Sequence, residues 1–311
     1  MHGRRPGPGS DESHPQSVHG RHPARRRGAW RRSCCGAPRR KDNVGSVNAA
    51  EPVMPRPAAT VLLLRDGPDG RLQVFLQRRV KGMAFAGGMT VFPGGGVDAS
   101  DRAVAWEGPE PAWWAERLGC TADEAAGFVL AAVRETFEEC GVLLADGASV
   151  DAGVLARARD DVAQRRRVFG DVLTGLGLRV RADLLHPWAR WITPIVQPRR
   201  YDTAFFTAIV PPGQEADAQT TEAVEATWWT PAAALTAFRD GEIGLMRPTR
   251  TILTDIAAFP DAASLHAAAP TGAISSILPM VVEGLPDVLL PGDEGYDLHV
   301  ASGHAPAGGH R

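Results

Sequence analysis

The sequence predicts an α/β domain, because short apolar runs of strand length alternate with segments of helical composition. Two of the runs, 59–64 and 72–77, are separated by Asp, Gly and Pro residues at 66–70, a composition that favours a β-hairpin. The segment 123–140 is rich in Ala, Leu and Glu, which favour a helix. Gly141 follows it, where a glycine commonly ends a helix.

The rest of the chain continues this alternation of strands and helices. Pro231 is typical of a first helical turn. The further strands are predicted at 89–92, 188–195, 204–210 and 223–229, and the further helices at 111–118, 151–167, 171–177, 231–238 and 248–259. After Pro260 only the runs 277–282 and 287–290 are strand-like, and we expect them to pack as a terminal hairpin.

Composition divides the 311 residues into three parts. Residues 1–50 are rich in Arg, Gly, Pro, Ser and His and hold almost no large apolar side chain, so they cannot form a core. We expect a disordered basic tail at 1–53, a folded domain at 54–260, and a C-terminal extension at 261–311 that packs on the domain and ends in a frayed segment. Met54 opens a typical domain start, so Met1 and Met54 both stay candidates for the translated start.

The distribution of charge argues against a specific nucleic-acid surface. Residues 1–41 hold eleven basic and two acidic residues, which leaves a net charge of −11 on 42–311. A basic tail can bind nucleic acid or anionic membrane nonspecifically, but an acidic body is not typical of a nucleic-acid-binding domain. No run of eighteen apolar residues occurs, so no membrane span is expected.

The four cysteines show neither zinc spacing nor a Cys-x-x-Cys pair, which suits a reducing compartment. The C-terminal sequence Gly-Gly-His-Arg is not a peroxisomal address of the Ser-Lys-Leu type. We therefore expect a cytoplasmic protein. A homodimer is the candidate assembly.

Residues 134–142 carry the most informative motif, Arg-Glu-Thr-Phe-Glu-Glu-Cys-Gly-Val. Glu135, Glu138 and Glu139 are spaced i, i+3 and i+4, so they share one side of a helix. Clustered carboxylates raise one another's pKa, and a hard divalent cation such as Mg²⁺ or Mn²⁺ relieves the repulsion. The ordinary alternative is a solvated acidic face. The apolar residues expected on the core-facing side are Val129, Val133, Phe137 and Cys140.

Phe-Pro-Gly-Gly at 92–95, followed by the motif at 134–142, resembles the Nudix box of the Nudix hydrolases, G-x5-E-x7-R-E-U-x-E-E-x-G-U, where U is aliphatic. Thr136 takes one aliphatic position. The resemblance covers roughly residues 55–260. It implies the Nudix fold, a mixed β-sheet sandwiched between α-helices, and a metal-dependent hydrolase that cleaves a nucleoside diphosphate linked to another moiety.

The first half of the box departs from this pattern. Ala126 stands where the first Glu belongs, and Gly95 and Arg134 are 39 positions apart where an unbroken box would place them 14 apart. We therefore predict an insertion inside the box at about 99–123. Asp123 or Glu124, at the end of that insertion, is the candidate to replace the missing Glu.

An interrupted box is similar to the Nudix subgroup that includes the peroxisomal coenzyme A diphosphatases. The segments 83–95 and 191–206, the second with Arg-Arg-Tyr-Asp-Thr, resemble that subgroup as well. Trp106, Trp113 and Trp114 in the insertion either anchor it to the domain or line a substrate pocket, and the first role is the one we expect of large aromatic residues.

The resemblance implies a role for each acidic residue of the motif. Glu138 and Glu139 are expected to coordinate Mg²⁺ or Mn²⁺, with the backbone carbonyl of Gly95 as a further ligand. Glu135 corresponds to the Glu that binds metal or assists deprotonation of water, and it shares the catalytic role with Glu139. Arg134 is expected to orient a Glu through a charge-assisted bond.

Residues outside the box complete the predicted site. Some family members take the catalytic base from a late loop, and Glu222 is our candidate, with Glu225 as its neighbour; the ordinary alternative for both is a solvated residue. Arg199 and Arg200 are candidates for phosphate contacts or for structural ion pairs. Tyr201 is a candidate to stack on a base or to pack in the domain.

Three functions fit these residues. The first is a diphosphatase of coenzyme A or acyl-CoA, which yields adenosine 3′,5′-bisphosphate and (acyl-)4′-phosphopantetheine. The second is the same chemistry on ADP-ribose, NADH or a nucleotide sugar. The third is a non-catalytic Nudix sensor that binds a nucleotide, motivated by Ala126. In each case the expected partner is a small-molecule nucleotide.

Overall fold

The computed structural model describes residues 52–299, with gaps at 84, 102–103, 148, 221 and 286. The predicted disorder of residues 1–51 and the predicted fraying of 300–311 lie outside the described residues.

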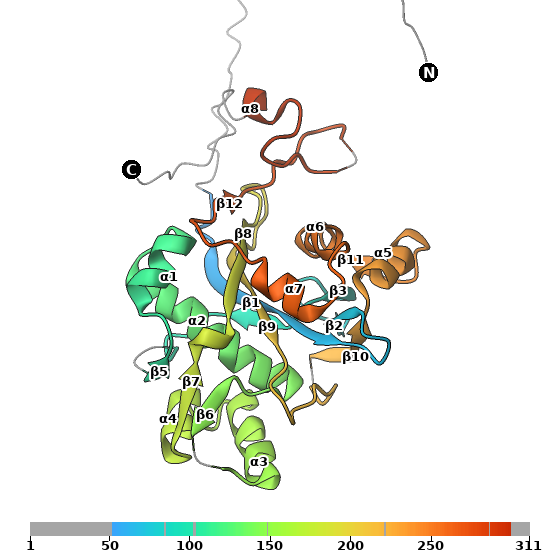
Figure 1. The fold of residues 1–311 in the computed structure, drawn as a ribbon. Coiled ribbons are helices and arrows are strands. Elements are labelled where there is room, and N and C mark those ends of the chain that lie inside the picture. Colours follow the sequence, from blue (N-terminus) through green and yellow to red (C-terminus); the bar gives the residue numbers. More distant parts are fainter. Residues whose placement is uncertain are drawn as a thin grey trace, which may run out of the picture. The chain divides into compact units, whose positions relative to one another are not determined.

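A mixed sheet forms the centre of the described domain (Figure 1). The order of neighbouring strands in this sheet is β11-β3-β2-β1-β9-β8-β12. In addition, β10 pairs with β2 and β4 pairs with β1. β1 is parallel to β9 and antiparallel to β2 and β4. The strands are β1 (Arg56–Asp66), β2 (Leu72–Arg79), β3 (Met89–Val91), β4 (Gly94–Gly96), β8 (His186–Ile192), β9 (Tyr201–Ile209), β10 (Ala223–Trp229), β11 (Gly244–Leu245) and β12 (Ser276–Ile277).

Three parts of this strand arrangement were not predicted. The glycines at 94–96 form the short strand β4, and β11 pairs with β3 at the edge of the sheet. A second small sheet joins β5 (Trp106–Glu107), β7 (Leu178–Arg181) and β6 (Ala145–Gly147). These strands have two to four residues, too few for an alternating pattern to emerge from the sequence.

The predicted helices are confirmed to within a few residues, and two further short helices occur. The helices are α1 (Pro111–Leu118), α2 (Ala122–Cys140), α3 (Ala152–Ala163), α4 (Phe169–Gly175), α5 (Pro231–Arg239), α6 (Arg247–Ile256), α7 (Ala262–Ala267) and α8 (Tyr296–His299), with one 3-10 turn at Ala182–Leu184. Of these, α7 and α8 were not predicted.

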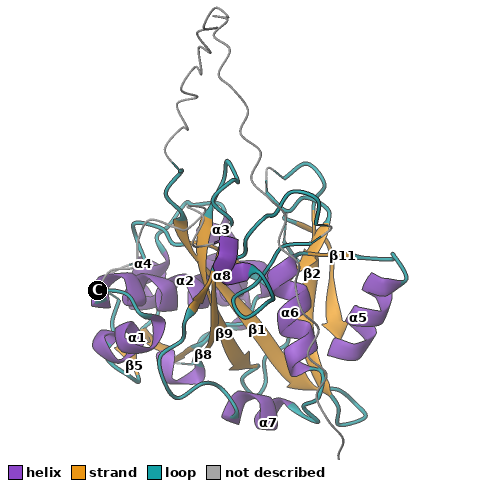
Figure 2. Ribbon diagram, turned by 90° about the horizontal axis from the view of Figure 1, so that it is seen from above, coloured by secondary structure: helices purple, strands orange, loops and turns teal. Residues whose placement is uncertain are grey.

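The side chains of β1 alternate between two cores, which places the sheet between helical layers (Figure 2). Val61 and Leu63 pack into a core shared with α2, whereas Leu62 and Leu64 pack into a core shared with α6 and α7. All four side chains are fully buried, which accounts for the continuous apolar run in this strand. The predicted fold class, a mixed sheet sandwiched between helices, is confirmed.

Local sequence determines where α2 begins and ends. Thr121 and Glu124 form a capping box, in which the Thr121 hydroxyl accepts from the Glu124 N–H and the Glu124 carboxylate accepts from the Thr121 N–H. Gly141 ends the helix with a φ of 72°, a conformation that favours glycine. The predicted core-facing residues are confirmed as buried: Val129, Val133, Phe137 and Cys140.

The tryptophans anchor α1 to the first core. Trp114 is fully buried, donates its indole N–H to the Pro109 carbonyl at 3.1 Å, and packs edge-on against Phe206 of β9. Trp113 packs against Trp114 with ring centroids 4.8 Å apart. This confirms the anchoring role for these two residues, whereas the insertion inside the Nudix box stays a prediction.

The segment after Pro260 continues the packed structure. Leu265 of α7 is fully buried in the second core, and β12 extends the sheet beside β8. Met280 and Leu289 form an antiparallel bridge between the two runs expected as a hairpin. Within the described residues, no helix combines the length and the apolar character that a membrane crossing requires.

Candidate active site

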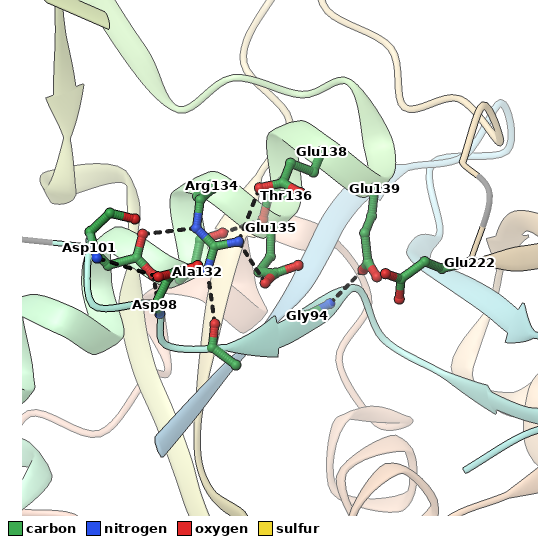
Figure 3. A network of polar contacts seen from close by, with 12 residues as sticks. Gly94, Asp98, Asp101, Ala132, Arg134, Glu135, Thr136, Glu138, Glu139 and Glu222 are labelled. Carbon is green, nitrogen blue, oxygen red and sulfur yellow. Dashed lines mark hydrogen bonds and ion pairs between the residues drawn. The ribbon is translucent and has the colours of Figure 1, made fainter. Parts of the chain in front are cut away.

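The acidic face of α2 lies against the glycine strand β4 (Figure 3). The backbone N–H of Gly94 donates to Glu139 Oε2 at 2.7 Å. A side chain at Gly95 would overlap the carboxylate of Glu135, since the position of its Cβ falls well inside van der Waals distance of that group. A side chain at 95 would therefore push the Glu135 carboxylate aside, which links glycine at this position to the placement of that carboxylate.

Arg134 organises the acidic residues around it. Its guanidinium donates to Asp101 through two parallel bonds of 2.8 Å, to the Gly96 carbonyl at 2.8 Å, and to Glu135 and Glu138 at 2.8 and 3.0 Å. Burial alone would lower the pKa of Arg134, but the bond to Asp101 and the charges of the glutamates raise it overall. The predicted orienting role is in keeping with this geometry.

Asp101, not Asp123 or Glu124, provides the carboxylate that pairs with Arg134. Glu124 caps the first turn of α2, and Asp123 is exposed in the same turn, ten or more residues before Arg134. The Asp101 side chain is only 2% exposed, held between Arg134 and the N–H of Asp98. The role expected of Asp123 or Glu124 stays a prediction; the capping signal at Thr121 accounts for the position of the Glu124 carboxylate at the helix start.

Glu139 is the most deeply buried of the three glutamates. It is 3% exposed, and its Oε2 accepts from Gly94 N–H and from Gln77 Nε2, the latter at 2.6 Å. Gln77 lies on β2, and its own Oε1 is buried with no hydrogen-bond partner among the described residues. Gln77 was not predicted as a site residue, although a lone Gln in an apolar strand is a signal of a buried polar contact.

Burial and mutual repulsion change the protonation of the glutamates. Desolvation, together with neighbouring carboxylates, raises the pKa of Glu135 to about 7 and that of Glu139 to about 8. Arg134 opposes the shift at Glu135, and the Gly94 N–H opposes it at Glu139. The surroundings therefore favour the protonated form of both carboxyls in the metal-free site, and ionising them is unfavourable without a cation.

These shifts predict how stability depends on pH. Both carboxyls have a pKa of 4.5 in the absence of these interactions, so in the metal-free protein they favour folding fully below that pH. This contribution is lost as pH rises through about 7 and about 8. Thermal unfolding in EDTA should therefore show the Tm of the wild type falling, relative to Glu139→Gln, between pH 5 and pH 8. A difference in Tm that is constant across this range would contradict the prediction.

Glu222 lies beside these carboxylates although it is 83 residues from Glu139 in the chain (Figure 3). Its charge contributes to the raised pKa of both Glu135 and Glu139, and Arg79 holds it through an ion pair of 3.3 Å. Its side chain is 52% exposed, so water can reach it. Glu225 instead pairs with Arg78 on the exposed side of β2 and β10.

Two cavities meet at Glu135 and Glu222. The first, the aromatic cavity, has a volume of about 620 Å³ and is lined by Gly95 and by aromatic rings. The second, the acidic cavity, has a volume of about 650 Å³ and lies beside the C-terminal end of α2. The aromatic rings of the first are Phe85, Phe92, Trp191, Tyr201 and Phe205. The carboxylates of the second, besides the shared pair, are Glu138, Glu139, Asp146, Asp160, Glu215 and Asp217.

The three predicted substrate-binding residues lie in different surroundings. Tyr201 lines the aromatic cavity and packs against Phe85, with centroids 4.9 Å apart. Arg200 is buried and donates to the carbonyls of Thr193 and Val53, so its guanidinium already has structural partners. Arg199 is exposed in the turn before β9. Contact of either arginine with phosphate stays a prediction.

The donor set fits a divalent cation. Among the described residues, no three acidic, His or Cys side chains converge tightly enough to hold a metal ion as they stand. Nevertheless Glu135, Glu138 and Glu139 each keep one carboxylate oxygen without a hydrogen-bond partner in the described part of the chain. Oxygen donors with excess negative charge are the ligands that Mg²⁺ and Mn²⁺ prefer.

Gly95→Ala tests the close approach of β4 to α2. We expect kcat/KM to fall by roughly 100-fold, because the added methyl displaces the Glu135 carboxylate by about 1 Å. Steady-state kinetics on the folded variant measures the effect. Gly96→Ala is the matched control, since a Cβ there meets no atom within 4 Å. Equal activity of the two variants would show that Glu135 need not occupy this position.

Comparison with known proteins agrees with this fold and site. Residues 112–252 match the sequence model of the NUDT19 Nudix domain. The chain is 30% identical to the acyl-coenzyme A diphosphatase NUDT19 of Gallus gallus, over 78% of this chain and 79% of the relative. It is 29% identical to the Homo sapiens protein of that name, over 78% and 76%. A crystal structure of a NUDIX hydrolase from Alicyclobacillus acidocaldarius is 28% identical, with a TM-score of 0.59, over 71% of this chain and 98% of that one.

A mixed sheet between helical layers, with an acidic helix facing a glycine strand, defines a Nudix hydrolase. The chain belongs to the Nudix family, in the group described by the NUDT19 Nudix domain. The resemblance drawn from the interrupted box is thereby confirmed.

Proposed function

We propose that this protein hydrolyses the diphosphate bond of coenzyme A or acyl-CoA with Mg²⁺ or Mn²⁺. Water is consumed, and the products are adenosine 3′,5′-bisphosphate and (acyl-)4′-phosphopantetheine. The observation that carries the proposal is the cluster of Glu135, Glu138 and Glu139 against β4. The relatives that are named acyl-coenzyme A diphosphatases support the choice of substrate.

The metal would be held by the carboxylates of Glu135, Glu138 and Glu139 and by the carbonyl of Gly95. When bound, Mg²⁺ or Mn²⁺ supplies positive charge for the diphosphate oxygens and increases the acidity of water. Arg134 keeps Glu135 and Glu138 in place, because its guanidinium bonds both of them and is itself fixed by Asp101. Gly94 and Gln77 fix Glu139 in the same way.

Glu222 is the base that we propose, with Glu135 and Glu139 assisting. It is reached by solvent and lies next to both buried glutamates, so it can accept a proton from the attacking water. Its ion pair with Arg79 orients the carboxylate.

The aromatic cavity is the proposed site for the adenine-bearing half of the substrate. The rings of Tyr201 and Phe85 can stack on a base, and Arg199 lies in the loop that leads to Tyr201. The lining of the acidic cavity holds several carboxylates and one arginine, Arg159, an excess of negative charge that disfavours the more phosphorylated half of the substrate.

We favour hydrolysis over the non-catalytic sensor, because Glu135 and Glu138 are both bonded by Arg134, which Asp101 in turn fixes. Hydrolysis of ADP-ribose, NADH or a nucleotide sugar needs the same site, and only the substrate differs. We also propose that the protein acts in the cytoplasm on free nucleotides, with a homodimer as its candidate assembly.

The test is turnover over a panel of CoA, acyl-CoA, ADP-ribose, NADH and dinucleoside polyphosphates, with Mg²⁺, with Mn²⁺ and with EDTA. We expect metal-dependent release of adenosine 3′,5′-bisphosphate from CoA or acyl-CoA. Faster cleavage of another substrate would overturn the choice of CoA. Absence of all turnover, with tight nucleotide binding, would support a sensor instead.

A further inference from the structure

We propose that Arg165, in the loop after α3, binds the diphosphate of the substrate. Arg165 lines the aromatic cavity together with Glu135, Gly95 and Glu222, although it is 30 residues beyond Glu135 in the sequence. It belongs to no sequence motif that we identified. The inference rests on the proposed function in one respect, namely that the ligand of this site carries a diphosphate.

The backbone of Arg165 has a conformation that usually requires glycine. Its φ is 56°, and its N–H donates to the Val162 carbonyl at 2.8 Å, while the next N–H, of Arg166, donates to the Asp161 carbonyl at 2.7 Å. These two bonds form a Schellman motif at the end of α3, in which the residue at the position of Arg165 is most often Gly. An arginine at this position is therefore unfavourable for folding and needs another explanation.

The other non-glycine residue with a positive φ in the described chain, Ala86, lines the same cavity. Among the described residues, only Ala86 and Arg165 combine a side chain with a positive φ, and both line the aromatic cavity. Unfavourable backbone conformations concentrate at functional sites, where they position groups for a ligand. The conformation of Arg165 therefore ends α3 and also places its side chain at this cavity.

The guanidinium of Arg165 is available for a ligand. It has no ion pair and no side-chain hydrogen bond with any described residue. Its neighbours differ: Arg166 pairs with Asp160 and Asp161, and Arg159 pairs with Asp217. An unpaired arginine beside a group of carboxylates can offer two parallel N–H donors to phosphate oxygens.

The diphosphate would lie between Arg165 and the glutamates that line the same cavity. Phosphate oxygens are stabilised by positive charge, and Arg165 is the cavity-lining cation without a partner in the described chain. Arg79 and Arg247 also line this cavity, but they already pair with Glu222 and Asp287.

Arg165→Gly separates a structural role from a binding role. Glycine suits the observed φ, so the variant should fold with a Tm equal to or above that of the wild type. Loss of a charge-assisted contact should lower kcat/KM for CoA by about 10- to 100-fold, mostly through KM. Arg165→Lys, which keeps the charge, should recover part of this loss. Arg166→Ala is the matched control, because it removes a neighbouring arginine that pairs within α3.

Binding of ADP in the presence of Mg²⁺, measured by isothermal titration calorimetry, gives a second readout that needs no turnover. Weaker binding to Arg165→Gly than to Arg166→Ala would support the proposal even if the wild type left CoA intact, in which case only the proposed substrate fails. Equal KM and equal ADP affinity for these two variants would overturn it. So would a wild type that binds no ADP.

Discussion

Glu139→Gln is expected to lower kcat by about 1,000-fold and to leave the fold intact. The loss follows from removing one of the carboxylates proposed to hold the metal, whose charge stabilisation amounts to several kcal/mol. The fold should persist because a glutamine side-chain oxygen can still accept from the Gly94 N–H and from Gln77. Single-turnover measurements with CoA and Mg²⁺ would determine the loss in the chemical step.

The same substitution should stabilise the metal-free protein above pH 8. The Glu139 carboxylate is buried beside Glu135 and Glu222, so its ionised form is unfavourable there, whereas a neutral amide is not. Calorimetry should show a higher Tm in EDTA and a smaller rise in Tm upon addition of Mg²⁺. Glu225→Gln serves as the control, because within the described residues its exposed carboxylate pairs with Arg78 alone. Turnover at the level of the wild type would exclude Glu139 from the mechanism.

The motif at 134–142 made much of this site predictable. The i, i+3, i+4 spacing determined that Glu135, Glu138 and Glu139 share one side of α2, and the periodic apolar residues determined which side faces the core. Helical periodicity links residues that are near in sequence, so a local pattern is sufficient. Tyr201 and Glu222 were predicted as site residues from the family resemblance, and both line the aromatic cavity.

The partners of these residues could not be predicted, because they come from distant segments. Gln77 reaches Glu139 from 62 positions away, and Asp101 reaches Arg134 from 33. Neither pairing follows from local periodicity; each depends on how β2 and the segment after β4 are placed around α2. Arg165 was missed for a further reason: its signal is a backbone conformation, and an arginine in a polar segment is ordinary in sequence.

Asp101→Ala is expected to lower the free energy of unfolding by about 3–5 kcal/mol, the cost of removing one partner from a buried ion pair. Asp101 and Arg134 are 2% and 10% exposed, so water cannot replace the lost carboxylate. Urea unfolding measures the change. Asp101→Asn keeps an acceptor for one of the two guanidinium bonds, so we expect a smaller loss.

Asp101→Ala should also lower activity, because it frees Arg134 to compete with the metal for the glutamates. Without Asp101, the partners of Arg134 in the described chain are Gly96, Glu135 and Glu138, and Arg134 would neutralise the glutamates proposed to bind the metal. The apparent affinity for Mg²⁺ should then weaken, which a metal titration of turnover detects. Asp123→Ala removes an exposed carboxylate near the start of the same helix and should change neither stability nor metal affinity by more than a small amount. If Asp123→Ala had the larger effect, Asp101 would not be the residue that replaces the missing glutamate of the box.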